Sequence, residues 1–329
     1  MDLNIIWFLL IGVLLVGYSV LDGFDLGVGV LRLFIKDEEE KEILLKSIAP
    51  FWDGNEVWLL TGGGAIFAAF PHVYATVFSG FYLALMLLLV ALIFRAISIE
   101  FRNQVESAAW KGFWDKAFSF GSLISALLLG VALGNIFVGI PLGADMNYSG
   151  TFFGLLRPIP LLVGLTGVMM FCLQGAAFLL VKTEGELYQK VKVWTRKCWL
   201  YLIILIVLTA LLTLVMDSSK VKTVMSSIFG YAALLVVIVG VVSLPRFLQG
   251  EQNFKVLISS SLIIFSMFLV VAGGIFPNMV PALNPEYSLT IYNAASSQLT
   301  LKVMLVMALL GMPIVLVYTT VIYRIFRKI

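Results

Sequence analysis

The sequence predicts an all-α polytopic membrane protein of nine transmembrane helices, with residues 1–329 forming a single integral membrane domain. Three observations point to this fold class. Hydrophobic residues make up 61% of the chain and charged residues only 12%, whereas soluble domains are about one quarter charged. Apolar runs long enough to cross a bilayer recur along the whole chain. Basic residues gather in alternate connections between these runs.

Nine apolar runs define the expected helices. The second run is the shortest and contains three consecutive glycines, residues 62–64. Nine helices would suit two four-helix bundles plus one peripheral helix, although no internal sequence repeat supports that division. The runs lie at residues 5–33, 53–70, 75–99, 113–138, 158–181, 198–216, 224–244, 255–276 and 300–323.

The distribution of Lys and Arg predicts the orientation. If the odd-numbered connections and the C-terminus share one side, 18 of the 22 basic residues lie there. The positive-inside rule then places the N-terminus outside and the C-terminus in the cytoplasm. The cytoplasmic set is Arg32, Lys36, Lys41, Lys46, Arg95, Arg102, Lys111, Lys116, Lys182, Lys190, Lys192, Arg196, Lys197, Arg246, Lys255, Arg324, Arg327 and Lys328, and the outer set is Arg157, Lys220, Lys222 and Lys302.

Two polar connections are long enough to consider separately. Residues 36–46 mix acids and bases and are typical of a solvated cytoplasmic loop. Residues 277–298 contain three prolines with several Asn and Ser residues, a composition that predicts an ordered or semi-ordered loop outside the membrane.

Two carboxylates lie within the first apolar run. A charged side chain in hydrocarbon costs at least ~2.5–3.5 kcal/mol, so each acid needs a partner, water or a function. Asp22 and Asp25 are three residues apart and share one helical face. Helical rise places them roughly 15 and 10 Å from Arg32 at the cytoplasmic end. Two poorly solvated acids this close would not both ionise readily, which suits proton transfer. A static, hydrogen-bonded helix contact is the alternative.

A second acidic pair, Asp53 and Glu56, begins the second run just after a proline. Acids in a first helical turn complement the helix dipole, which is one explanation for them. Trp52 and Trp58 bracket the pair and favour a position at the membrane interface, with Asn55 adding a neutral donor and acceptor. Together with the first pair, these residues predict a polar route inward from the cytoplasm.

The third run ends in Arg95, Glu100 and Arg102 on the same expected side. Arg95 is the best candidate counter-ion for one of the buried acids, and snorkelling to lipid headgroups is the alternative. Asp115 and Lys116, at the start of the fourth run, are expected to be surface groups.

The sequence offers few ligands for a redox centre. His72 is the only histidine, and a haem or copper centre normally uses more than one His or combines His with Met or Cys. Cys172 and Cys198 lie in or beside apolar runs and do not suggest a disulfide or a metal site. No CxxCH, P-loop or Rossmann pattern occurs. We therefore expect this chain to bind no metal or haem of its own, and to be a membrane partner or a transporter.

Several motifs resemble subunit II of the cytochrome bd-type quinol oxidases. The similarity is dense over residues 17–102 and 273–304, whereas the fourth to seventh runs fit only in number and length. The matching segments are Leu-Asp-Gly-Phe-Asp-Leu-Gly at 21–27, Ala-Pro-Phe-Trp-Asp-Gly-Asn-Glu-Val-Trp at 49–58, and residues 63–71, 78–82, 288–297 and 299–304.

The resemblance implies a nine-helix subunit paired with a haem-carrying subunit I in a heterodimer. That complex would oxidise membrane quinol and reduce dioxygen to water without pumping protons, in the bacterial cytoplasmic membrane. Haem b and haem d would belong to subunit I, and this chain alone would not be catalytic. A small single-span accessory subunit and lipids are further partners in this reading, and nucleic acid is not. Whether this chain holds a structural quinone stays open.

For the site, the resemblance implies proton supply from the cytoplasm, with Asp53 as the matching acid and Asp22 and Asp25 as weaker candidates. The family varies at the position of Glu56, so this chain carries an extra ionisable group there. Two other functions stay open at this stage. One is a proton-coupled secondary transporter, although broken helices and inverted repeats are not evident. The other is a purely structural assembly subunit.

Overall fold

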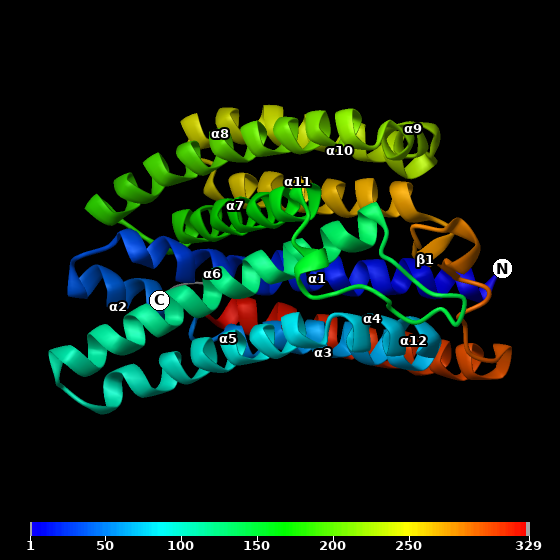
Figure 1. Cartoon of the computed structure of the whole chain (residues 1–329). Coiled ribbons are helices and arrows are strands. Elements are labelled where there is room, and N and C mark those ends of the chain that lie inside the picture. Colours follow the sequence, from blue (N-terminus) through cyan, green and yellow to red (C-terminus); the bar gives the residue numbers. More distant parts are fainter. Residues whose placement is uncertain (1, 327–329) are drawn as a thin grey trace.

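Helices dominate the computed structural model, which describes residues 2–326 (Figure 1). The prediction of an all-α chain is confirmed, with one two-stranded sheet in the described part. The α-helices are α1 Leu3–Leu31, α2 Glu38–Ile48, α3 Trp52–Ala69, α4 Pro71–Gly80, α5 Tyr82–Phe101, α6 Ala108–Val138, α7 Pro158–Lys182, α8 Gly185–Met216, α9 Ser218–Ser226, α10 Ile228–Gln249, α11 Asn253–Ile275 and α12 Gln298–Ile325. The shorter elements are η1 Arg32–Phe34, η2 Arg102–Gln104, η3 Phe153–Leu155, η4 Pro285–Tyr287, β1 Asn278–Val280 and β2 Leu289–Thr290.

Eight helices in the described chain are long and apolar enough to cross a membrane: α1, α5, α6, α7, α8, α10, α11 and α12. The missing ninth is α3, whose first two turns carry the polar residues Asp53, Asn55 and Glu56. Composition alone therefore leaves the count of nine as a prediction.

The packing of α3 nevertheless follows α1 along most of its length. Near its start, the side chain of Asn55 donates to the Leu21 carbonyl oxygen, and near its end Ala69 joins the hydrophobic cluster that contains Trp7. Eighteen helical residues rise by about 27 Å, close to the thickness of a bilayer core. This helix is therefore long enough to serve as the ninth crossing.

Several helix boundaries differ from the expected ones. The run expected at 75–99 is divided, because Pro71 begins a short helix α4 and the chain turns at Phe81 before α5. The run expected at 198–216 begins thirteen residues earlier, at Gly185. Lys, Arg and Glu are good helix formers, so the helix continues through a charged stretch where the apolar run has ended.

Residues 36–46 are mostly helical, and the expectation of a solvated loop was wrong for most of them. The carboxylate of Asp37 caps the N-terminus of α2 by accepting a hydrogen bond from the Glu40 amide at 3.0 Å. Three further acids follow in the first turn and Lys46 lies in the last, an arrangement that matches the helix dipole. We call this end of the molecule the α2 end.

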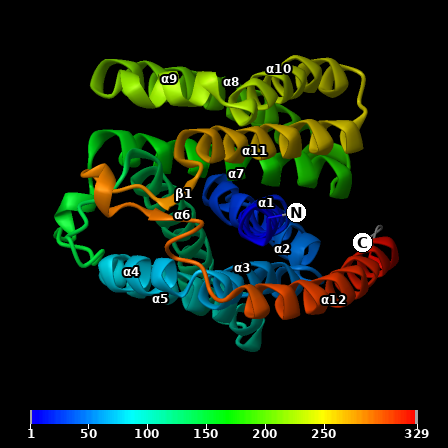
Figure 2. The same ribbon diagram turned by 90° about the vertical axis from the view of Figure 1, so that its right-hand side faces the viewer.

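The long helices pack around α1 (Figure 2). On one side α1 contacts α3 and α6, and α6 contacts α5. On the other side α1 contacts α7, which packs on α8 and α11, while α11 packs on α10. The two groups share a broad junction where α1 and α6 meet α7. Helix α12 is peripheral: it packs on α1 and α3, and among its residues, all described, only Leu301 is buried.

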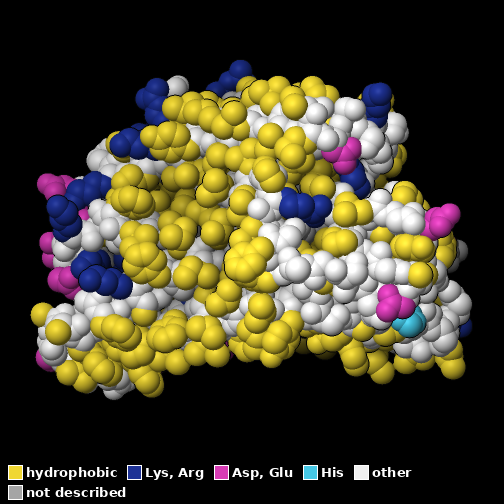
Figure 3. Space-filling model, viewed as in Figure 1, with side chains coloured by type: hydrophobic (Ala, Val, Ile, Leu, Met, Phe, Trp, Pro, Cys, Tyr) yellow, Lys and Arg dark blue, Asp and Glu magenta, His cyan; other side chains and the backbone are white. Residues whose placement is uncertain are grey.

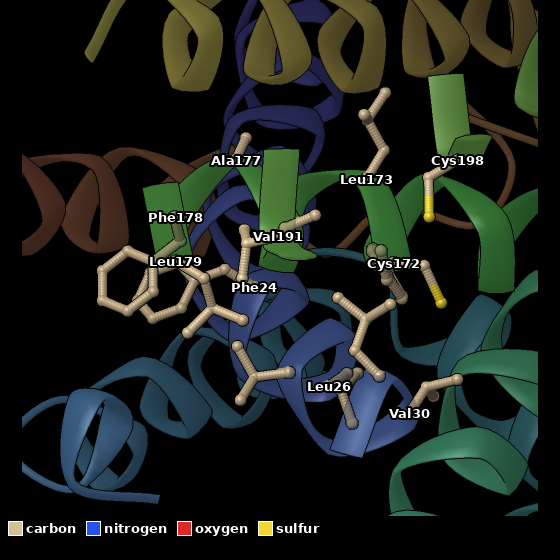
Figure 4. Packing of buried hydrophobic residues seen from close by; sticks show 14 of the residues in the cluster. Phe24, Leu26, Val30, Cys172, Leu173, Ala177, Phe178, Leu179, Val191 and Cys198 are labelled. Carbon is tan, nitrogen blue, oxygen red and sulfur yellow. The ribbon is translucent and has the colours of Figure 1, made fainter. Parts of the chain in front are cut away.

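Small residues allow α1 and α7 to touch backbone to backbone. A Cβ atom on Gly27 would lie 1.8 Å from the Phe171 carbonyl oxygen, and one on Gly175 would lie 2.6 Å from the Val28 nitrogen. Close approach of this kind drives helix association in lipid, where hydrophobic burial contributes little. Next to this contact Phe24 stacks on Phe178 with ring centroids 4.0 Å apart (Figure 4).

The opposite end of the molecule, which we call the strand end, is ordered around β1 and β2. Antiparallel pairing of these strands gives residues 277–298 a fixed shape, which fits the expected ordered segment. The segment is also tied to α1, since the Asn4 amide donates to the Ile291 carbonyl oxygen at 2.7 Å. In the first turn of α12, the Leu301 carbonyl oxygen accepts a hydrogen bond from the Trp7 indole at 3.0 Å.

Surface chemistry matches a membrane-embedded chain. Hydrophobic side chains cover the middle of the face shown in Figure 3, and many charged side chains gather toward the α2 end. Of the basic residues expected to be cytoplasmic, Arg327 and Lys328 lie outside the described residues.

We predict that Gly27→Ala lowers the thermal unfolding temperature of the purified protein in detergent by several degrees. The added methyl group forces α1 away from α7, and overpacking of this kind costs about 1–3 kcal/mol. The matched control is Gly12→Ala on the same helix, where nothing lies within 4 Å of the new Cβ. Equal melting temperatures for the two variants would contradict the contact.

Candidate functional site

Asp22 and Arg95 form a bidentate ion pair in the interior. The two terminal nitrogens of the Arg95 guanidinium donate to the two Asp22 carboxylate oxygens at 2.8 and 2.5 Å. Both side chains have 0% exposure. Of the two alternatives for Arg95, the structure therefore shows the counter-ion and not the snorkelling side chain. Such planar two-point contacts are the strongest form of carboxylate recognition, and they hold α5 against α1.

Asp25 is equally buried but is bound only by a neutral group. The Asn55 amide nitrogen donates to one Asp25 carboxylate oxygen at 2.7 Å, while the other oxygen, Oδ1, has no hydrogen-bond partner among the described residues. The Asn55 carbonyl oxygen in turn accepts from the Tyr323 hydroxyl at 3.1 Å. A chain of hydrogen bonds thus runs from the last helix, α12, through α3 to a buried acid on α1.

Glu56 connects this interior to the surface. One of its carboxylate oxygens lies 3.7 Å from a terminal nitrogen of Arg95, and its side chain is 23% exposed. Two carboxyl groups therefore lie within 4 Å of one guanidinium, and Asp25 follows Asp22 by one helical turn. We call Asp22, Asp25, Asn55, Glu56 and Arg95 the buried acid cluster.

Other sequence-predicted site residues lie at the margin of this cluster or outside it. Asp53 is exposed on α3, one turn from the cluster, and no hydrogen bond or ion pair of its side chain is found in the described chain. Glu100 is exposed on α5. Trp58 is not at the surface but is buried, with its ring covering Gly17, and Trp52 is half-buried against the hydrophobic core.

A second ionic group at the α2 end corrects the expectation for Asp115. Instead of being a surface group, Asp115 is 8% exposed. One of its carboxylate oxygens lies 2.6 Å from nitrogens of both Arg32 and Arg102, and the other lies 3.3 Å from the Lys41 ammonium. Arg102 also contacts two acids of α2, Glu38 at 2.7 Å and Glu42 at 2.9 Å. This α2-end ion network joins α1, α2, α5 and α6.

Sequence reasoning missed two participants for a clear reason. Nothing in the composition of the last run indicates that Tyr323 reaches Asn55, because the contact joins residues 268 positions apart. Asp115 follows Trp114 at the start of a long apolar run, in the place where a surface acid is usual. The surplus of basic residues at this end was the available signal that a buried acid would be needed there.

The described residues also include a large apolar cavity of about 360 Å³ between the two helix groups. Its wall includes Tyr18, whose hydroxyl has no hydrogen-bond partner among the described residues, and Thr166 and Thr209, which are 3.1 Å apart through their hydroxyls. Met170 and Met267 contribute flexible apolar surface. The cavity therefore suits an apolar molecule that carries a hydrogen-bond acceptor.

The histidine of this chain is not among the residues that line the cavity. An axial ligand such as His, Met or Cys must face a large flat pocket. His72 is exposed in the first turn of α4. Within residues 2–326 no group of three His, Cys, Asp or Glu side chains is placed to hold a metal ion.

We predict strong coupling between Asp22 and Arg95 in a double-mutant cycle. Arg95→Met leaves buried carboxylates without their cation and should destabilise the purified protein by about 3–5 kcal/mol. The double variant Asp22→Asn with Arg95→Met should cost clearly less than the sum of the single changes. Denaturant unfolding in detergent measures the terms, with Glu100→Gln as a surface control, and additive values would show that the pair contributes nothing.

Comparison with known proteins assigns this chain to one family. A model of the family described as cytochrome bd terminal oxidase subunit II matches residues 3–326. The chain is 37% identical to cytochrome bd-I ubiquinol oxidase subunit 2 of Escherichia coli K12, with 96% of this chain and 92% of that protein covered. It is 35% identical to cytochrome bd ubiquinol oxidase subunit 2 of Bacillus subtilis, with 99% and 96% covered.

A solved structure agrees with the fold. The bd oxidase structure from Geobacillus thermodenitrificans contains a chain that superposes with a TM-score of 0.83, at 19% identity and with 99% of both chains covered. The motifs that carried the resemblance are thus part of a match along nearly the whole sequence. The chain belongs to the cytochrome bd terminal oxidase subunit II family.

Proposed function

We propose that this chain is the second subunit of a membrane quinol oxidase and helps to supply protons from the cytoplasm for the reduction of dioxygen to water. Family membership supports the first part, since its relatives are named as ubiquinol oxidase subunits. The observation that carries the second part is the buried acid cluster. Three carboxyl groups and one guanidinium lie inside an apolar chain, and Glu56 extends them to the surface.

The α2 end is the proposed cytoplasmic end. The connections expected to be cytoplasmic meet there, and acids of the α2-end ion network form ion pairs with some of their basic side chains. In this orientation the N-terminus is outside and the C-terminus is in the cytoplasm. Protons consumed by oxygen chemistry would enter from this end, while quinol releases its protons outside. Each charge separated in this way stores about 2.3 kcal/mol per 100 mV without a pump.

The catalytic centre of the proposed complex would lie in a partner, subunit I. Haem b and haem d would be held there, and the exposed position of His72, the histidine of this chain, supports that assignment. This chain would therefore act through proton delivery and through its contact with the partner. Quinol, lipids and a small single-span accessory subunit complete the proposed surroundings.

The two alternative functions fit the structure less well. A proton-coupled transporter needs substrate sites at broken helices near the midplane, yet the helices carrying the acid cluster are continuous through Asp22, Asn55 and Arg95. A purely structural subunit has no need for Glu56. The ion pair of Asp22 and Arg95 already has no net charge, and Glu56 adds a further acid beside it. Proton supply accounts for this excess of acids.

We also propose that the apolar cavity holds a quinone in a structural role. Tyr18 would donate a hydrogen bond to a quinone oxygen, and the methionine and leucine side chains would contact its apolar tail. A bound quinone would supply redox-active carbonyl groups and rigid packing between the helix groups. No step of the oxygen chemistry is assigned to it.

We predict that Asp53→Asn slows oxygen consumption by the purified complex several-fold and leaves its haem spectrum and subunit content unchanged. The side chain is exposed and has no hydrogen bond or ion pair to lose among the described residues, so folding should tolerate the change. Glu100→Gln is the matched control, because it neutralises another exposed acid on a neighbouring helix. Unchanged turnover in Asp53→Asn would favour a helix-capping role for this acid.

We predict that Leu133→Trp lowers the quinone content of the purified complex. The larger side chain fills part of the cavity, so solvent extraction and chromatography should recover less quinone per haem. Leu89→Trp, at an exposed position on α5 that does not line the cavity, is the control. Equal quinone recovery from both variants and the unmodified complex would remove the cavity from the proposal.

A further inference from the structure

Five buried polar atoms around the acid cluster have no hydrogen-bond partner among the described residues. They are Tyr18 Oη, Asp25 Oδ1, Glu56 Oε1, Arg95 Nε and Ser125 Oγ. Buried polar atoms are normally satisfied by protein or by ordered water, and leaving one unsatisfied costs about 1–3 kcal/mol. Five such atoms, contributed by α1, α3, α5 and α6, are an unusual concentration, and they need a common explanation.

The register between α1 and α6 places Ser125 at this cluster. A Cβ atom on Gly29 would lie 2.1 Å from the Ser122 hydroxyl oxygen, so these residues face one another. Further along the same antiparallel contact, Leu129 packs beside Tyr18. Ser125 shares the face of α6 that carries Ser122 and Leu129 and lies between them. It is therefore level with the two aspartates of α1, and its exposure is 0%.

Charge gives a second reason for a bound polar species. Arg95 is the cation that faces Asp22, Asp25 and Glu56, and the other ionisable groups turned toward them from α1 and α12 are the phenols of Tyr18 and Tyr323. A buried site with more acids than bases is costly unless protons or hydrogen-bond donors compensate. Water molecules can donate to Asp25 Oδ1 and to the oxygen of the Tyr18 hydroxyl, and they can accept from Arg95 Nε and from the Ser125 hydroxyl.

We propose that Ser125, Tyr18, Asp25, Glu56 and Arg95 bind a cluster of internal water molecules that holds an exchangeable proton. This inference deepens the proposed proton supply and rests on it. Ser125 is the new member, since it lies outside every motif of the sequence. It binds water from α6, whereas Asn55 contacts Asp25 from α3, so that water joins the partly exposed Glu56 to the fully buried Asp25. A proton arriving at Glu56 then reaches Asp25 along water without movement of a helix.

The first test is a high-resolution cryo-electron microscopy map of the intact oxidase complex. We expect water density at hydrogen-bonding distance, about 2.7–3.2 Å, from Asp25 Oδ1, Ser125 Oγ and Arg95 Nε. Direct protein contacts that satisfy all of these atoms without water would overturn the proposal.

The second test compares Ser125→Ala with Ser266→Ala in the same complex. Ser266 is equally buried, but its hydroxyl donates to the Ile263 carbonyl oxygen on its own helix. We expect Ser125→Ala to slow proton uptake several-fold and to change the solvent deuterium isotope effect on oxygen reduction, while Ser266→Ala changes neither. Haem content should be equal in both, which separates proton transfer from misfolding.

The outcomes distinguish this inference from the function on which it rests. Slow turnover in Asp53→Asn together with normal proton uptake in Ser125→Ala would keep proton supply and reject the water cluster. Normal proton uptake in Asp53→Asn, Glu56→Gln and Ser125→Ala alike would reject both. Slow uptake in Glu56→Gln and Ser125→Ala, with water density at the named atoms, supports both.

Discussion

The ion pair between Asp22 and Arg95 is the constraint on which the rest of the structure depends. A lone charge at this depth would be unstable in lipid, so α1 and α5 must stay together once either residue is present. Gly121 gives the Arg95 backbone room, since a Cβ there would lie 3.2 Å from the Arg95 nitrogen, and α6 therefore fits closely against α5. The helices around α1 are arranged so that one cation can serve several acids.

The two faces of α1 make different kinds of contact: one packs closely against apolar residues, and the other makes polar contacts. Toward α7, glycines bring the backbones into contact and the core is apolar (Figure 4). Toward α3 and α5, the same helix presents Asp22 to Arg95 and Asp25 to Asn55. The apolar face fixes the position of α1, and this fixed position allows polar atoms on the other face to remain in place without a full set of protein partners.

Sequence predicted the fold class and the acids of the site, because both depend on local patterns. Apolar length fixed most spans, and carboxylates inside such a run are conspicuous. The sequence did not predict the features that depend on contacts between residues far apart in the chain. Asp115 is a buried partner of Arg32 and Arg102, and Tyr323 reaches across from the last helix, although neither position carries a local signal. The helix at 38–48 was missed because ion pairs and dipole effects stabilise it more than apolar periodicity does.

The attachment of α12 has a consequence for biosynthesis. This helix is held at the strand end by the Trp7 indole and toward the α2 end by the Tyr323 hydroxyl. Because the ribosome makes Tyr323 after α1 and α3, the amide that holds Asp25 gains its hydrogen bond from the Tyr323 hydroxyl only after α12 has been synthesised. Maturation of the acidic interior is thus coupled to the synthesis of α12, and a nascent chain stalled before that helix leaves the Asn55 carbonyl oxygen without its donor.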